Sequence, residues 1–212
     1  MKSRLFALLL LLLPAVALAA PDAPQAGVDY VEIPDGKPFA PLAGKVEVVE
    51  VFGYTCVHCA HLEPTLAQWK RRQPAHVRFT AVPAAFGGYW LPYARAYYAA
   101  ESLGVLERTH AQVFKALHEQ QLLPIQNASA DEIADYYASL GVDRQRFIDA
   151  LRNPALEARL QRSREFMAAA GVEGTPTLIV NGRYRVIGGR NFDEALRIVD
   201  QLVARERAAA RR

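Results

Sequence analysis

The chain has 212 residues with a formal net charge of +3, and 51% of its residues are hydrophobic. Two of the positive charges, Lys2 and Arg4, lie within the first 19 residues, which contain no acidic residue, so residues 20–212 carry a net charge of +1. A net charge this small lacks the excess of basic residues that nucleic-acid-binding proteins have, so we expect no nucleic-acid partner. The two cysteines, Cys56 and Cys59, are three positions apart and cannot close a long loop, which excludes a disulfide-stapled scaffold.

The N-terminal segment predicts a secretory signal peptide over residues 1–19. A short basic stretch precedes a leucine-rich run at residues 5–13, and Ala17-Leu18-Ala19 supplies small residues two positions apart. We expect cleavage after Ala19. The alternative, an uncleaved membrane anchor, needs about 20 apolar residues, and this run is shorter and is broken by Pro14. We therefore expect the mature protein to be soluble in an oxidising compartment.

The first third of the mature chain predicts the order strand, helix, strand. Residues 30–33 form a short edge strand in this interpretation, and residues 45–52 form the clearest strand. Residues 45–52 have apolar side chains at both parities, which is typical of a central strand and places Glu50 among apolar neighbours. A helix over residues 56–72 with an apolar stripe follows, then a strand over residues 76–82.

The middle of the chain changes to helical patterns, and the end returns to strands. Ser129 and Glu132 form a capping-box pattern, and Asn181-Gly182 between two apolar runs predicts a β-hairpin. The expected elements are helices at residues 90–103, 105–121, 129–140, 143–151 and 154–170, strands at 177–181 and 184–187, and a last helix from 192 to about 203.

This order predicts an α/β fold with an inserted helical domain. We assign residues 20–85 and 153–212 to the α/β domain and residues 86–152 to the insertion. Two separate domains in tandem fit less well, because the C-terminal hairpin would then have no sheet to join.

The sequence Cys56-Val57-His58-Cys59 lies where the central strand ends and a helix begins. The first turn of a helix presents free N–H groups and the positive end of its dipole, which favour a thiolate over a thiol at Cys56. His58 adds a second donor near that sulfur. We predict that Cys56 is the nucleophile that forms a mixed disulfide with a substrate, and that Cys59 resolves it.

Three other interpretations of this motif are less favoured. Haem attachment requires histidine directly after the second cysteine, and that residue is Ala60. Metal binding by Cys56, His58, Cys59 and His61 would require a tetrahedron from one helical turn. A purely structural disulfide across so short a loop would contribute little to stability.

The cysteine motif has a wider context. The sequence Val49-Glu50-Val51-Phe52-Gly53-Tyr54-Thr55-Cys56-Val57-His58-Cys59 continues through Ala60-His61-Leu62-Glu63-Pro64, and Val172-Glu173-Gly174-Thr175-Pro176-Thr177 precedes the hairpin. Together these segments resemble the DsbA family of periplasmic thiol:disulfide oxidoreductases. The resemblance covers nearly the whole mature chain and implies a thioredoxin fold with an inserted helical domain.

The resemblance also implies roles for individual residues. Cys56 and Cys59 would be the redox pair, and His58 would tune the thiolate. Thr175 and Pro176 would form the cis-proline loop that faces the disulfide and binds an extended substrate peptide. Two acids would support the site, Glu50 as the buried acid beneath it and Glu63 as the second acid of the motif.

The chain departs from the family pattern at two positions. Val57 stands where many members have proline, which leaves the oxidising strength open. Pro74 stands where some members have a buried lysine, so Glu50 is expected to lack that partner.

From these features we expect a monomeric oxidase that donates the Cys56–Cys59 disulfide to reduced, newly secreted proteins in the periplasm. The resemblance implies a membrane partner of the DsbB type that reoxidises it. The sequence shows no quinone or flavin site, and we expect no cofactor. The alternatives are a disulfide isomerase or reductase on the same fold and, in another class, a non-catalytic module that binds a metal or a peptide.

Overall fold

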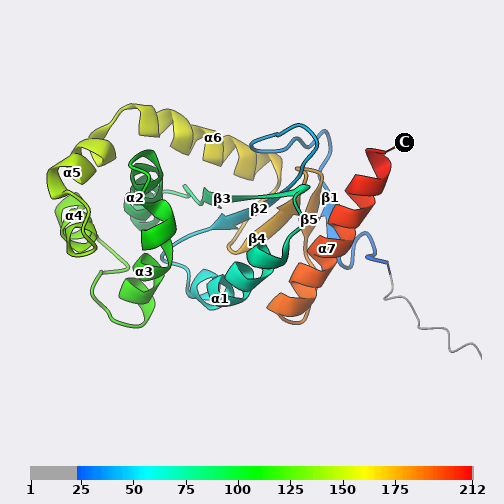
Figure 1. Cartoon of the computed structure of the whole chain (residues 1–212), viewed down its shortest axis with the longest axis horizontal. Coiled ribbons are helices and arrows are strands. Elements are labelled where there is room, and N and C mark those ends of the chain that lie inside the picture. The colour runs from blue at the N-terminus through cyan, green and yellow to red at the C-terminus, as the bar shows by residue number, and fades with distance from the viewer. Residues whose placement is uncertain (1–22, 212) are drawn as a thin grey trace, which may run out of the picture.

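The computed structural model describes residues 23–211 (Figure 1). The predicted signal peptide lies outside the described residues. Five strands form one mixed sheet in the order β1-β5-β4-β2-β3. Their bounds are Tyr30–Glu32 for β1, Val46–Phe52 for β2, Val77–Pro83 for β3, Thr177–Val180 for β4 and Tyr184–Val186 for β5.

The strand β2 is buried at every position, as predicted for a central strand. It pairs in parallel with β3 and antiparallel with β4, and Glu50 lies opposite Ala81 on β3 and Leu178 on β4. The predicted edge strand at residues 30–33 is also confirmed, because β1 pairs only with β5 among the strands of the sheet.

Helices cover both faces of the sheet. The two helices α1 (Val57–Arg72) and α7 (Phe192–Ala209) lie on one face (Figure 1), where Val46 and Val48 pack with residues of both helices. On the other face, α6 (Ala155–Ala169) packs against the side chains of opposite parity, Val49 and Val51. The alternation of the β2 side chains therefore fixes which helix covers which face.

The remaining helices gather at the end of the sheet where β2 stops (Figure 1). They are the short 3₁₀ helix η1 (Gly88–Trp90) and the α-helices α2 (Leu91–Ser102), α3 (Leu106–His118), α4 (Ala130–Ser139) and α5 (Arg144–Arg152). Their buried side chains form one cluster with Phe52, Tyr54 and Cys59. The helical block thus shares its hydrophobic core with the loop that holds the cysteines.

Two local predictions are confirmed in atomic detail. The Ser129 hydroxyl accepts a hydrogen bond from the Glu132 backbone N–H, and the Glu132 carboxylate accepts one from Ser129 N–H, which completes the capping box of α4. Asn181 and Gly182 have φ values of +51° and +67°, and both are left-handed, as the two-residue hairpin turn requires.

The final helix is longer than predicted. It continues to Ala209 instead of ending near residue 203. The reason is Glu206, a buried acid that interrupts the apolar pattern. Its carboxylate accepts a hydrogen bond from Asn181 and pairs with Arg183 at 3.3 Å, so the last turns of α7 are anchored to the hairpin.

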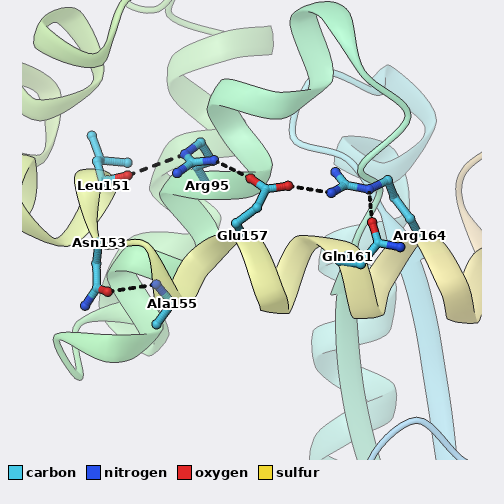
Figure 2. Close-up of polar contacts among 7 residues, drawn as sticks. All are labelled: Arg95, Leu151, Asn153, Ala155, Glu157, Gln161 and Arg164. Atoms are coloured by element: carbon cyan, nitrogen blue, oxygen red, sulfur yellow. Dashed lines mark hydrogen bonds and ion pairs between the residues drawn. The ribbon is translucent and has the colours of Figure 1, made fainter.

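Polar contacts join α6 to the helical block (Figure 2). Arg95 on α2 donates to the Leu151 carbonyl of α5 at 3.4 Å and pairs with Glu157 on α6 at 3.1 Å, while Glu157 also pairs with Arg164. Exposed ion pairs of this kind contribute little to stability. Their geometric effect is that α6 is held against α2 and α5 as it returns the chain to the sheet.

We predict that Ser129→Ala destabilises the protein by about 1 kcal/mol, because it removes the N-cap acceptor and leaves an N–H of α4 unpaired. Urea unfolding of the two proteins measures this difference. Gln68→Ala, at an exposed position on α1, is the control and should change stability by less than about 0.5 kcal/mol. Equal destabilisation by both substitutions would contradict the capping role.

Candidate functional site

The two cysteines lie at the junction of β2 and α1. Cys56 is the N-cap residue of α1 with an extended backbone, and its N–H donates to the Gly53 carbonyl at 3.0 Å. Gly53 is required at this bend, because a Cβ atom there would lie 2.2 Å from the Trp90 ring. The close packing of η1 against residue 53 therefore fixes the path of the chain into Cys56.

The surroundings of Cys56 favour its thiolate. The Cys59 thiol donates a hydrogen bond to the Cys56 sulfur, and this bond is the largest influence that lowers the pKa of Cys56, to about 5. Partial burial opposes it, while the Thr175 side chain and the backbone N–H groups of His58 and Cys59 add to the lowering. These N–H groups belong to the first turn of α1, as the sequence predicts.

Cys59 has the opposite character. It is completely buried one turn into α1, and burial raises the pKa of its thiol, as do its hydrogen bond to Cys56 and the nearby Glu50. At neutral pH the pair therefore holds one thiolate at the partly exposed sulfur and one proton at the buried sulfur.

Thr175 and Pro176 face the cysteines from the other side of the site. The Thr175-Pro176 peptide bond is cis, and the Cys56 sulfur lies 3.3 Å from the Thr175 carbonyl oxygen, to which it donates only in its thiol form. The Thr175 hydroxyl is buried and has no other hydrogen-bond partner among residues 23–211, so it is free to donate to the sulfur when Cys56 is ionised.

A cavity of about 530 Å³ opens beside Cys56 and Thr175. Its wall includes Val57, Phe86 and Tyr89, whose apolar side chains are exposed. The partly exposed Cys56 sulfur therefore lies beside a cavity whose wall combines these apolar side chains with polar groups such as Glu173 and Thr175.

Glu50 lies on β2, six residues before Cys56, and is 2% exposed. Burial is the main cause that raises its pKa to about 8, and the negative charge of Glu63 adds to the increase. Lys70 opposes it. At neutral pH Glu50 is therefore mostly protonated, and it interacts electrostatically with both cysteines.

Glu63, on α1, remains ionised. Its pKa is lowered although burial alone would raise it, because His110 and Lys70 both favour the carboxylate. The Lys70 ammonium lies 3.5 Å from one carboxylate oxygen and His110 Nε2 lies 3.6 Å from the other. The two acids of the motif therefore differ in charge, because Glu63 has cationic or donor partners and Glu50 has almost none.

Pro74 does not lie beside Glu50, and no lysine of β3 pairs with Glu50 within residues 23–211. Pro74 lies between α1 and β3, and the residue beside Glu50 on β3 is Ala81. A positive charge nevertheless acts on Glu50, and it comes from Lys70 in the last turn of α1. Lys70 sits on the helix rather than on the strand, so no comparison of strand positions could find it.

The structure brings Cys56, Cys59, Thr175 and Pro176 together, with Glu50 and Glu63 behind them. The remaining predicted residue, His58, has an exposed side chain, and its backbone N–H is what favours the Cys56 thiolate. Sequence reasoning missed Lys70 and Tyr54, although both lie close to the cysteines in the sequence. It also missed His110 and His118 of α3, which reach Tyr54 only because the helical block packs against the active-site loop. Helical spacing, which puts Glu63 and Lys70 on one face of α1, was the one usable signal.

Residues 23–211 contain no group of three or more His, Cys, Asp or Glu side chains arranged to hold a metal ion. Within the same residues, no helix is both long and apolar enough to cross a membrane.

Comparisons with known proteins agree with this geometry. A family model described as thioredoxin matches residues 38–201. The thiol:disulfide interchange protein DsbA of Pseudomonas aeruginosa is 38% identical over 189 residues, which covers 88% of each chain. The protein of the same name from Burkholderia cepacia is 35% identical over 187 residues and 87% of each chain.

Solved structures show the same similarity. The crystal structure of the oxidoreductase DsbA from Xylella fastidiosa superposes with a TM-score of 0.85 at 55% identity, over 88% of this chain and all of that one. Pseudomonas aeruginosa DsbA superposes with a TM-score of 0.82 at 37% identity, over 89% of this chain and 97% of that one. The predicted thioredoxin fold with helical insertion is confirmed.

We predict that the folded, reduced protein takes up one alkyl group at neutral pH, at Cys56 alone. The rate of reaction with iodoacetamide should rise with pH around a midpoint near 5, the pKa of this thiol, because the thiolate is the nucleophile. Mass spectrometry after timed quenching measures both quantities. A midpoint near the ordinary value of 9.0, or equal labelling of Cys59, would contradict this description of the site.

We predict that Glu50→Gln changes how stability depends on pH. The pKa of Glu50 is about 8 in the folded protein and 4.5 ordinarily, so the folded state binds more protons between these values, and Glu50 makes stability fall as pH rises. Glutamine removes this loss, which amounts to about 1.4 kcal/mol per unit of pKa difference.

Urea unfolding of both reduced proteins at pH 5, 6.5 and 8 checks this prediction. The unfolding free energy of Glu50→Gln minus that of the wild type should increase with pH across this range. A difference that stays constant would mean that Glu50 titrates normally.

Proposed function

Because this chain belongs to the DsbA family of thiol:disulfide interchange proteins, we propose that it oxidises reduced, newly secreted proteins by donating its Cys56–Cys59 disulfide. The observation that carries the proposal is the place of Cys56, partly exposed at the N-cap of α1 with the buried Cys59 one turn further on, where the pKa of Cys56 is lowered to about 5. A stabilised thiolate favours the reduced form of the enzyme, which makes its disulfide a stronger oxidant, by about 30 mV for each 1.4 kcal/mol.

The reaction follows from the two unlike sulfur atoms. A substrate thiolate attacks Sγ of Cys56, the Cys56–Cys59 bond breaks, and the Cys59 sulfur leaves with the electron pair and takes up a proton. A second substrate thiolate then attacks the substrate sulfur of the mixed disulfide, and Cys56 leaves as a stable thiolate. The substrate loses two electrons and gains a disulfide, and the enzyme gains the two electrons as its thiolate and thiol.

The supporting residues have separate roles in this proposal. Glu50 is mostly protonated at neutral pH and interacts electrostatically with Cys59. It can therefore supply the proton that the leaving sulfur takes up. Thr175 and Pro176 face Cys56 and would present backbone groups to an extended substrate. His58 would act through its backbone N–H, and Glu63 would hold a fixed negative charge behind Glu50.

The location and partners follow from the family. We propose that the protein acts as a monomer in the periplasm after removal of residues 1–19, and that a membrane protein of the DsbB type reoxidises it. We also propose that residues 86–152 act as an inserted helical domain in residues 20–85 and 153–212. The shared cluster of these helices with Phe52 and Tyr54 supports a role in holding the active-site loop.

We predict that Cys56→Ser abolishes oxidation of a reduced two-cysteine peptide, because the attacked sulfur is absent. Cys59→Ser, joined at Cys56 to an activated peptide with a single cysteine, should hold a stable mixed disulfide, because neither an internal thiol nor a second substrate thiol is present to resolve it. Free-thiol titration and intact-mass spectrometry with and without dithiothreitol measure these outcomes. Wild-type protein that has been reduced and alkylated is the matched control, and retained oxidation by Cys56→Ser would overturn the proposal.

A further inference from the structure

His110 on α3 lies between the active-site loop and the acid pair. Its Nδ1 atom is 2.7 Å from the Tyr54 hydroxyl, and its Nε2 atom is 3.6 Å from the Glu63 carboxylate. The imidazole is 13% exposed and packs against the rings of Phe52 and Phe114. Both ring nitrogens are therefore directed at groups of the redox site, although the residue comes from the helical block.

We propose that His110 is a positioning residue for disulfide exchange: with Lys70 it holds the Glu63 carboxylate in place, and through that negative charge it acts on the buried Glu50. This inference rests on the proposed function, since it concerns the same redox pair. His110 touches neither cysteine in this arrangement and acts through Glu63.

The hydrogen-bond pattern fixes the ring. With Nε2 facing a carboxylate, the proton of a neutral imidazole belongs on Nε2, and Nδ1 then accepts from the Tyr54 hydroxyl. Tyr54 is 2% exposed, and burial raises the pKa of its hydroxyl, so it remains a donor. Tyr54 therefore orients His110, and His110 orients Glu63.

Among the described residues around the Glu63 carboxylate, His110 and Lys70 are the two that pair with it. A cavity of about 720 Å³ opens beside them, between α1, β3, α2 and α3. The charged side chains that line it, besides Glu63, are Lys70 and Arg71 from α1, Arg78 from β3, Glu101 from α2 and Glu107 from α3. The Tyr97 ring of α2 lies 6.0 Å from His110. Of these cationic side chains, Lys70 pairs with Glu63, so without His110 the second carboxylate oxygen would face the cavity.

The position of the Glu63 carboxylate affects Glu50 through the Coulomb interaction between the two acids. A negative charge at Glu63 raises the pKa of Glu50. When the carboxylate of Glu63 turns toward the cavity or takes up a proton, that influence weakens and Glu50 ionises at lower pH.

The test measures the midpoint of the Glu50 carboxyl by ¹³C NMR in reduced protein labelled with ¹³C-glutamate, assigned with Glu50→Gln and Glu63→Gln. We expect His110→Leu to lower the midpoint from about 8 by about half a unit to one unit. His110→Gln, whose amide can reach the Nε2 position, should restore it. His110→Asn, which replaces only the Nδ1 contact, should not.

Two further proteins separate this mechanism from a general disturbance. His61→Leu removes an exposed imidazole of α1 and should leave the midpoint unchanged. In a Glu63→Gln background, His110→Leu should add no further shift, because the group through which it acts is gone. If His110→Leu does not fold, Tyr54→Phe tests the same chain of contacts and should lower the midpoint.

An unchanged midpoint in His110→Leu, or an equal shift with and without the Glu63 carboxylate, overturns the inference. The proposed function is tested apart from it, by peptide oxidation with the wild-type protein. Active wild-type protein together with an unmoved Glu50 midpoint would reject the role of His110 alone.

Discussion

The rest of the site depends on one interaction, the stabilisation of the Cys56 thiolate at the start of α1. It exists because β2, buried along its length, ends where α1 begins, so that the sulfur occupies the N-cap position of a helix. The N–H groups of the first turn and the Cys59 thiol then favour the thiolate. The path of the chain into this position is fixed in turn by Gly53, which leaves room for the Trp90 ring. The packing of Trp90 against Gly53 thereby helps to place the reacting sulfur at the start of α1.

The two acids of the motif differ in protonation at neutral pH. Glu63 has partners and remains an anion, whereas Glu50 lies in an apolar environment and holds a proton. A buried carboxyl group of this kind is unfavourable for folding. Its persistence at the base of a redox pair is typical of functional sites, where perturbed pKa values cluster. The large apolar clusters on both faces of β2 offset that cost.

Much of the fold could be predicted from the sequence, because its signals are local. The alternation in residues 45–52, the capping box at Ser129 and the Asn181-Gly182 turn each specify a local geometry. The cysteine motif and its position at a helix N-terminus were equally local. The end of α7 was not, because Glu206 is buried only through its contacts with the hairpin. His110 escaped for the same reason, since its role depends on which helix packs against the acids, whereas Lys70 had a local signal in its helical spacing from Glu63.

The helices α2 to α5 share one hydrophobic cluster with Phe52, Tyr54 and Cys59, and this has a consequence for how such a protein can be rebuilt. A cap that rested on the redox site through a separate interface could be cut away or exchanged as a cassette. Here a deletion of these helices would expose the end of β2 and the buried cysteine to water. Any foreign helical block grafted onto this protein must therefore reproduce the side chains that fill the shared core. The same requirement constrains recombination between distant relatives at the boundary between the helical block and the rest of the fold.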